Sequence, residues 1–182
     1  MGFEEKKGLD YSVAPVAQKR PIIWTPRKLR WMLNHYPPFW FQRIKIMEVD
    51  PDYRWMNVRM KKSILTRNLN GSAFGGSIYS AADPWFPILY WQALARQGFA
   101  LECWLKAATV DFNKPGASDL RLKFEISQAD LDLATKNLDI IGSSVHENTV
   151  EVIDLDGDIC ATVECVSYLR LLKKGHKEVA RF

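Results

Sequence analysis

The sequence predicts an α+β fold in which one long apolar helix is wrapped by a curved antiparallel sheet of about six strands. The most apolar stretch of the 182 residues, Phe74 to Trp91, is typical of a buried helix. Several other segments alternate apolar and polar residues, as half-exposed strands do. Asp156-Gly157 is a strong hairpin signal between two such segments.

The first third of the chain predicts one helix and two strands. Residues 1–24 show no clear period and are expected to form an N-terminal arm. A helix follows, because Thr25 can cap it, Pro26 suits its first position, and apolar residues recur at helical spacing up to the stop signal at residues 37–38. We expect strands over residues 39–50 and 53–61.

The remainder predicts a polar loop, the central helix and four strands. The polar loop is expected over residues 63–76 and the central helix over 75–97. The four strands are expected over 100–112, 119–127, 144–155 and 158–171. One extra helix with a capping box is expected over 127–142. A sheet that buries an apolar helix on most sides must curl around it, which is the hotdog arrangement. The predicted domain spans residues 25–172, with a tail at 173–182.

Composition excludes several classes of protein. With 25 basic and 21 acidic residues the chain is weakly basic, whereas a nucleic-acid binder usually carries a stronger local excess. Cys103, Cys160 and Cys165 form no CxxC pair, so we expect reduced core thiols and no metal site. The polar N-terminus lacks a signal-like apolar region and Phe74 to Trp91 is interrupted by polar and proline residues, so we expect a cytoplasmic protein without a membrane span.

Gly75 and Gly76 stand where the polar loop enters the central helix. A helix N-terminus offers free N–H groups and a partial positive charge, and glycine lets a ligand carbonyl approach closely. These glycines can therefore form an oxyanion hole. Close packing of the helix end against a strand is the alternative interpretation.

Asp83 lies eight residues after Gly75, a little over two helical turns. A carboxylate inside an apolar run is costly unless it is paired or functional, so Asp83 is a candidate nucleophile or general base. Asp-Pro is equally typical of an N-cap followed by a first helical residue, so the helix can also break here, with Asp83 capping a segment that starts at Pro84. The spacing supports both interpretations.

The run Phe74-Gly75-Gly76, six residues, then Asp83 resembles the active-site segment of phenylacetate-type (PaaI-like) hotdog acyl-CoA thioesterases, which carry His-Gly-Gly, six residues, then Asp. The Asn68-x-Asn70-Gly71 sequence before it, and the Pro-Pro-Phe at residues 37–39, resemble a little-characterised branch of that superfamily.

The resemblance implies a catalytic set of Asp83, Gly75 and Asn68, with the Gly75 N–H on the thioester carbonyl and the Asn68 amide assisting. Phe74 takes the place of the usual histidine, which removes a polar contact and makes the pocket more apolar. The candidate substrate contacts are Phe74, Gly76, Asn113, Lys114 and Arg67. On local grounds a solvated surface side chain is the favoured interpretation of Lys114 and Arg67, and a residue that satisfies loop backbone groups is the favoured interpretation of Asn68.

The expected function is hydrolysis of an acyl-CoA or acyl-carrier thioester, with CoA as part of the substrate and no other cofactor. The resemblance also implies a homodimer, with tetramers as an open possibility, because such sites lie between subunits. A non-catalytic acyl-CoA-binding protein is the alternative, favoured by Phe74. Hydration or dehydration of an acyl thioester ranks last, because no histidine stands beside Gly75.

Overall fold

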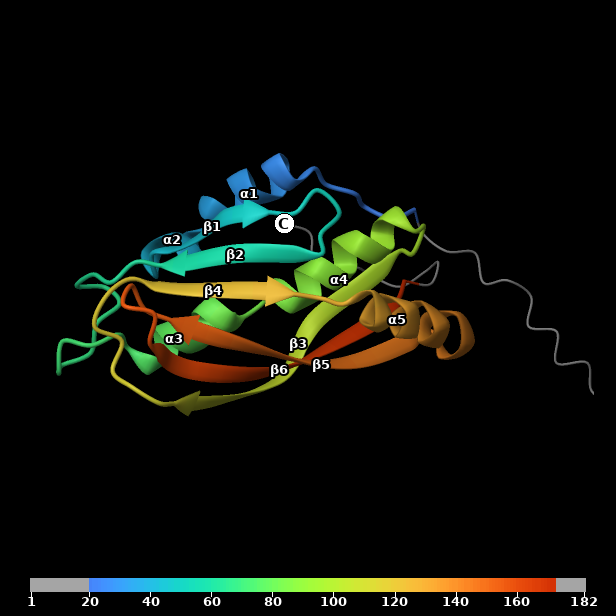
Figure 1. Cartoon of the computed structure of the whole chain (residues 1–182). Coiled ribbons are helices and arrows are strands. Elements are labelled where there is room, and N and C mark those ends of the chain that lie inside the picture. The colour runs from blue at the N-terminus through green and yellow to red at the C-terminus, as the bar shows by residue number, and fades with distance from the viewer. Residues whose placement is uncertain (1–19, 173–182) are drawn as a thin grey trace, which may run out of the picture.

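The computed structural model describes residues 20–172 (Figure 1). The elements in chain order are α1 (Pro26–Asn34), α2 (Pro37–Phe41), β1 (Ile44–Val49), β2 (Trp55–Met60), α3 (Gly75–Ala82), α4 (Trp85–Arg96), β3 (Leu101–Phe112), β4 (Leu120–Glu125), α5 (Gln128–Ile141), β5 (Ser143–Ile153) and β6 (Ile159–Leu171). No helix within this range is long and apolar enough to cross a lipid bilayer. The predicted tail, and the predicted arm up to residue 19, lie outside the described residues.

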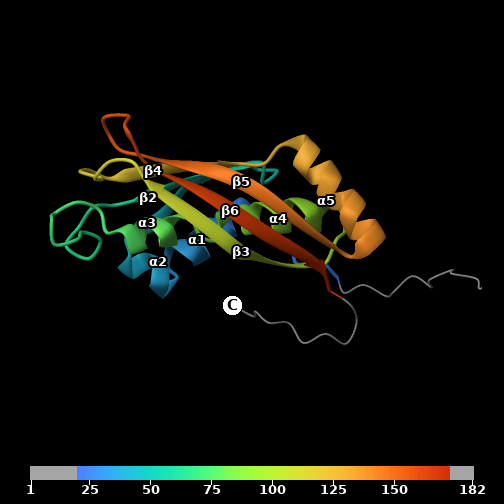
Figure 2. The ribbon, with the colours of Figure 1, turned by 90° about the horizontal axis from the view of Figure 1, so that it is seen from below.

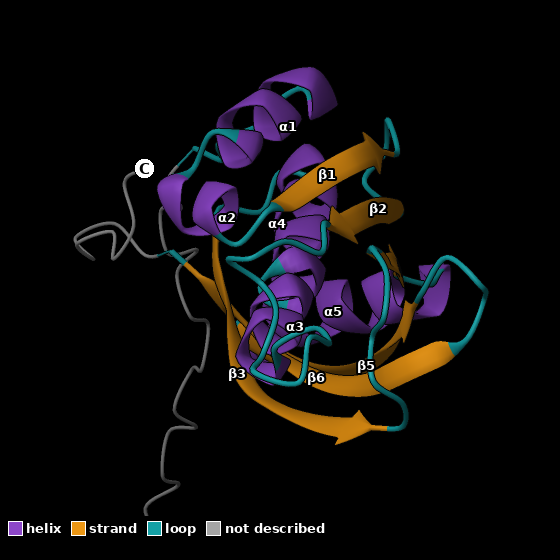
Figure 3. Cartoon of the chain, turned by 90° about the vertical axis from the view of Figure 1, so that its left-hand side faces the viewer, coloured by secondary structure: helices purple, strands orange, loops and turns teal. Residues whose placement is uncertain are grey.

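The six strands form a single antiparallel sheet in the order β1-β2-β4-β5-β6-β3. Seen from the end, the sheet curls around α3 and α4, which fill its concave side (Figure 3). The predicted hotdog fold is therefore confirmed. The hairpin between β5 and β6 turns at Gly157, whose φ of 89° suits glycine, while the Asp154 carboxylate accepts from the N–H groups of Asp156 and Asp158 at 3.0 Å each.

Two sequence predictions need correction. The strand predicted over 39–50 begins only at Ile44, because Pro37 and Pro38 occupy the first turn of a short helix, where their fixed φ and missing N–H are tolerated. The central helix predicted over 75–97 is two helices that meet at Asp83 and Pro84, which are joined by a cis peptide bond. The break was the alternative that the Asp-Pro pair suggested.

The core lies between the helices and the concave face of the sheet. Trp85 and Phe86, at the start of α4, are 1% exposed and pack against Phe124 of β4, with ring centroids 6.4 and 5.0 Å from it. Phe39 of α2 reaches Trp85 at 5.0 Å. Large aromatic side chains thus fix α4, and with it the position of Asp83, against two separate parts of the chain, α2 and β4.

Residues just before α1 are docked on α4. The fully buried amide of Gln92 accepts from the Trp24 N–H at 2.8 Å and donates to the Ile22 carbonyl at 3.2 Å. The Tyr53 hydroxyl donates to the Trp24 carbonyl at 3.0 Å, and the Trp24 ring packs edge-on against Trp91. The last residues of the predicted arm therefore share the packing of the domain.

Helix α5 packs against β5 at one end of the sheet (Figure 2). A buried polar cluster lies beside it. The predicted capping box is present, with Ser127 and Asp130 bonded reciprocally, and Gly142 ends the helix at φ 77°. Asn137 of α5 donates to the Ser144 hydroxyl at 3.1 Å, and that hydroxyl lies 2.8 Å from Nε2 of the buried His146. The His146 ring stacks on Tyr90 of α4 at 4.6 Å, so this cluster joins α5, β5 and α4.

His146 is expected to make stability depend on pH. Burial lowers the pKa of its imidazole below the ordinary 6.5, outweighing the opposite effect of Asp130, so the folded state favours the neutral ring. The contribution of the neutral ring to the free energy of unfolding is then fully present above pH 6.5 and is lost as the pH falls through the folded-state pKa. Urea unfolding of the wild type between pH 7.5 and 5 should show this loss.

The matched variants are His146→Gln and His35→Gln, the latter at an exposed histidine. His146→Gln should be less stable at pH 7.5 but lose less stability on acidification, whereas His35→Gln should follow the wild type. Equal pH dependence in all three proteins would contradict the assignment.

Candidate functional site

The loop that precedes α3 is held in place by Thr66, which is completely buried. Its hydroxyl donates to the Lys61 carbonyl at 2.9 Å and accepts from the Ser63 N–H at 2.9 Å. Its carbonyl accepts from the Phe74 N–H at 2.8 Å. One side chain and one peptide group thus tie the beginning of the loop to the residue that starts α3.

Asn68 organises the tip of this loop. Its Oδ1 accepts from the N–H groups of Asn70 and Ser72 at 3.0 and 3.1 Å, and its Nδ2 donates to the Ser72 hydroxyl at 2.8 Å. Gly71, at φ 79°, lets the chain turn back on itself. The Asn68 side chain therefore serves the loop backbone, as its local sequence suggested, and its assistance to a substrate stays a prediction.

The N-terminus of α3 presents two free donors. Phe74 is the N-cap residue, and its carbonyl accepts from the N–H groups of Ser77 and Ile78 at 2.9 and 3.1 Å. Neither Gly75 nor Gly76 donates its N–H to any residue between 20 and 172. The partial positive charge of a helix N-terminus adds to these donors, which suits a carbonyl oxygen that becomes negative.

Two exposed phenylalanine rings explain why both positions are glycine. A Cβ atom on Gly75 would lie 3.0 Å from Cζ of Phe112, and one on Gly76 would lie 2.5 Å from Cε1 of Phe74. Phe74 and Phe112 are 53% and 59% exposed, so they form an apolar rim around the helix N-terminus. Phe112, the last residue of β3, was missed in the sequence, where only the polar residues after that strand stood out as candidates.

Asp83 lies at the other end of α3, where it is half-buried. Its N–H donates to the Tyr79 carbonyl at 3.2 Å, but its carboxylate has no hydrogen bond or ion pair with the described residues. The N-cap position of α4 is Pro84 and no side chain caps this helix, so the capping interpretation of Asp83 is wrong. Burial raises the pKa of the Asp83 carboxyl above its ordinary value.

Cys165 of β6 forms part of the surroundings of Asp83. Burial and, to a smaller extent, the negative charge of Asp83 raise the pKa of its thiol to about 12, which indicates that the two groups are close. The thiol therefore stays protonated near neutral pH and is a poor nucleophile. In sequence Cys165 was indistinguishable from any other core cysteine.

The remaining predicted contacts lie on the surface. Lys114 pairs with Asp158 at 2.8 Å, a hydrogen bond and charge that raise the pKa of its ammonium group, and both residues are exposed. Asn113 is exposed, with its N–H donating to the Cys160 carbonyl at 2.9 Å. Arg67 is exposed and forms a backbone bridge with Ala73. Arg67 lies in the loop before α3, and Asn113 directly follows Phe112, whose ring lies next to Gly75.

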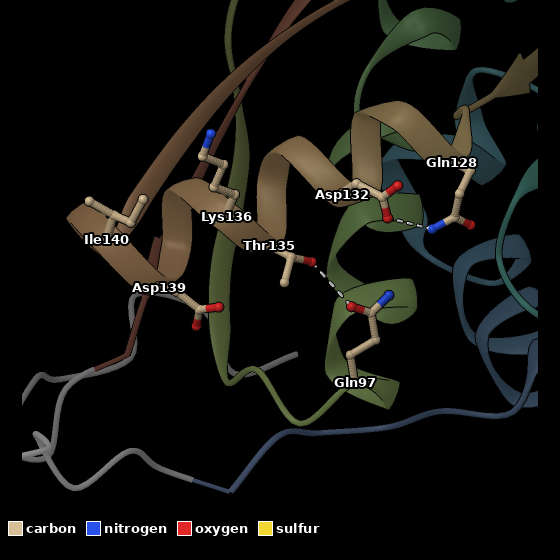
Figure 4. Close-up of a pocket in the computed structure, with 7 residues that line it drawn as sticks. All are labelled: Gln97, Gln128, Asp132, Thr135, Lys136, Asp139 and Ile140. Carbon is tan, nitrogen blue, oxygen red and sulfur yellow. Dashed lines mark hydrogen bonds between the residues drawn. The ribbon is translucent and has the colours of Figure 1, made fainter.

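Two grooves in the described structure lie away from these residues. One, of about 540 Å³, runs along α5 and is lined by polar side chains, among them Gln97, which accepts from the Thr135 hydroxyl at 3.2 Å (Figure 4). The other, of about 640 Å³, lies on the outer face of β1, β2 and β4. Between residues 20 and 172 no group of three or more His, Cys, Asp or Glu side chains is placed to hold a metal ion.

Comparison with solved structures supports the architecture. A protein of unknown function and probable thioesterase from Pseudomonas aeruginosa superimposes with a TM-score of 0.69 at 17% identity, covering 82% of this chain and 99% of its own. A thioesterase from Haemophilus influenzae gives 0.62 at 12% identity, with 85% and 97% covered. The PaaI protein of the phenylacetic acid degradation operon of E. coli gives 0.55 at 19% identity, with 81% and 93% covered.

These similarities show a shared hotdog fold. Among curated protein sequences none matches this chain. A family model described as a domain of unknown function, DUF4442, matches residues 26–169, which include every strand and helix of the domain except the end of β6. The chain therefore belongs to the DUF4442 family and has the hotdog fold.

Proposed function

We propose that this protein hydrolyses acyl thioesters carried by CoA or by an acyl-carrier protein. The observation that carries the proposal is Asp83, a half-buried carboxylate with no hydrogen bond or ion pair among the described residues. Structure alone gives no reason to keep such a costly group at the end of an apolar helix. The thioesterase names of two fold neighbours support the same chemistry.

The proposed reaction begins when the Gly75 N–H donates a hydrogen bond to the thioester carbonyl oxygen. Asp83, whose pKa is raised by burial, takes a proton from a water molecule that attacks the carbonyl carbon, or attacks that carbon itself. The negative oxygen that forms is stabilised by the free N–H groups of α3. When Asp83 acts as the base, the C–S bond breaks, the proton taken from water passes to the leaving sulfur, and the thiol and the acid are released. When Asp83 is the nucleophile, the thiolate leaves first and takes a proton from solvent, and a water molecule then hydrolyses the acyl–Asp83 anhydride to release the acid. CoA takes part only as a portion of the substrate.

The length of α3 argues that the complete site needs two subunits. Gly75 and Asp83 are separated by about 12 Å along the helix axis, whereas an oxyanion donor and a base on one carbonyl each lie about 3 Å from the reacting atoms. We therefore propose that Asp83 acts on a thioester held by Gly75 of the partner subunit. A cytoplasmic homodimer, or a dimer of dimers, would contain two such shared sites.

The free edge of β3 fits this assembly. Its outer side pairs with no strand in the described chain, and two of its residues are exposed aromatic side chains, Trp104 at 40% and Phe112 at 59%. An unpaired edge of this length is a ready site for a strand from a second copy. Phe112 at its end contacts the region of Gly75, so pairing here would bring the partner close to the candidate site.

A second candidate function, acyl-CoA binding without turnover, is favoured by one observation. Phe74, at the position where the resembling thioesterases carry histidine, puts an exposed apolar ring over Gly76. Calorimetry that detects acyl-CoA binding, together with no thiol release across a panel of acyl-chain lengths, would favour this alternative over hydrolysis.

Asp83→Asn is the direct test of the proposed chemistry. Thiol release from an acyl-CoA panel should fall by at least about 100-fold, because the amide can neither attack nor accept the proton. The same variant should melt at a higher temperature at pH 7. A raised carboxyl pKa means that the wild type loses stability as the pH rises through that pKa, and asparagine has no such ionisation.

Asp139→Asn, the same change at an exposed position of α5, is the control and should alter neither property. Wild-type turnover by Asp83→Asn on a substrate that the protein hydrolyses would refute the role of Asp83.

Gly75→Pro and Gly75→Ala together isolate the N–H of the oxyanion hole. Both add a Cβ atom facing the same Phe112 ring, but only proline removes the donor. Proline suits the first helical position, and Phe74 already has the extended backbone that a residue before proline prefers. We expect Gly75→Pro to lower kcat by roughly 100- to 1000-fold and Gly75→Ala to have a much smaller effect. Similar losses in both variants would indicate a steric role for Gly75.

Mixed dimers distinguish a shared site from one within a single chain. If Gly75 of one subunit works with the partner subunit's Asp83, a dimer of one Asp83→Asn chain and one Gly75→Pro chain retains one intact site. Refolding an equal mixture of the two inactive variants should then restore about a quarter of wild-type activity. No recovery, with hybrid dimers demonstrated by differently tagged chains, would place both residues in the same subunit's site.

A further inference from the structure

Helices α1 and α2 form an outer corner of the molecule (Figures 1 and 3). Three of their aromatic side chains are largely in water: Trp31 at 66%, Phe41 at 59% and Trp40 at 49% exposed. Large aromatic residues gathered on adjacent helices at such exposure indicate a surface that contacts something other than water. Ile22 and Ile23, just before α1, are exposed as well.

The charge of this part of the chain is one-sided. Residues 20–47 contain no aspartate or glutamate and six cationic residues, all of them exposed: Arg20, Arg27, Lys28, Arg30, Arg43 and Lys45. The rest of the chain holds 19 basic and 21 acidic residues. The slight positive charge of the whole protein therefore comes from this segment alone. We call these six cations and the three exposed aromatic residues the α1–α2 surface.

The cations of the α1–α2 surface are available to an anion from outside. None of them forms an ion pair with a residue between 20 and 172. Arg43 lies over the Trp40 ring at 5.6 Å and Lys28 lies 5.9 Å from the Trp24 ring. Trp40 and Phe41 pack edge to face at 5.0 Å. Cation and aromatic ring therefore stand together, a combination that suits the boundary between lipid headgroups and acyl chains.

We propose that the α1–α2 surface docks on an anionic lipid bilayer, with the tryptophan and phenylalanine rings at the level of the acyl-chain boundary and the cations among the headgroup phosphates. An outward corner with exposed rings enters a deformable bilayer readily, whereas a protein partner would need a matching cavity. Peripheral binding of this kind combines burial of apolar side chains with attraction between basic residues and anionic lipids. It requires no membrane-crossing helix and is independent of the thioesterase reaction.

Co-sedimentation of the full chain with vesicles tests the proposal. Vesicles of phosphatidylcholine with roughly 30 mol% phosphatidylglycerol should carry the protein into the pellet, whereas vesicles of phosphatidylcholine alone should not. Raising the salt from about 0.1 M to about 0.5 M should release it, because the attraction is screened. Tryptophan fluorescence should be quenched by brominated acyl chains in the anionic vesicles.

Two sets of variants sharpen the test. Arg27→Gln/Lys28→Gln/Arg30→Gln should lower the partition coefficient by about fivefold per cation, roughly 100-fold in all. Its control is Arg121→Gln/Lys123→Gln/Lys136→Gln, which removes the same charge from exposed positions elsewhere. After correction for the loss of net charge, the partition coefficient of this control should lie within about twofold of the wild-type value. Trp31→Ser/Trp40→Ser should lose roughly tenfold and most of the bromolipid quenching.

Three results would overturn the proposal. The first is no sedimentation with anionic vesicles at low salt. The second is an equal fall in the partition coefficient of the control triple variant, which would indicate that only the net charge of the protein attracts it to the vesicles. The third is a smaller molar mass for Trp31→Ser/Trp40→Ser than for the wild type, measured by light scattering in lipid-free solution. That result would show that a second copy of the chain covers the α1–α2 surface. Because all substituted side chains are exposed, unchanged circular dichroism and melting should confirm that each variant is folded.

Discussion

The half-buried carboxylate of Asp83 is the constraint around which the centre of this protein is arranged. It stands where α3 ends and α4 begins, next to Pro84, and the described residues give it neither a hydrogen bond nor an ion pair. Rings of α2 and β4 hold the start of α4 in the core, which fixes the backbone next to this carboxylate. A protein selected for stability alone would replace such a group, whereas a catalytic site commonly retains it.

The groups around α3 divide the chemical roles between its two ends. The N-terminus offers the free N–H groups of Gly75 and Gly76 inside a rim formed by Phe74 and Phe112. The other end offers a carboxylate beside the protonated thiol of Cys165. Because the two ends of α3 lie about 12 Å apart along the helix axis, the proposed chemistry, which uses both ends, requires a second subunit.

The two edges of the sheet are treated differently. At β1 the Asn34 amide of α1 bonds to both the N–H and the carbonyl of Ile46, at 2.7 and 3.0 Å, which closes that edge to another strand. At β3 the edge is left open and ends at Phe112, beside the candidate site. The β1 edge is thus covered by a side chain of the same subunit, whereas the β3 edge, unpaired among the described residues, could accept a strand of another subunit next to α3.

Local patterns in the chain were enough to predict the strand alternation, the capping box of α5, the Gly157 hairpin and the engagement of Asn68 by its own loop, because each depends on neighbours in the sequence. They were not enough to predict that Pro37 and Pro38 start a helix or that Asp83 leaves α4 uncapped. The approach of the Phe112 ring to Gly75, and the effect of the Asp83 charge on Cys165, join residues far apart in sequence. Only the curling of the sheet around α3 brings those residues together, and local periodicity contains no information about such pairs.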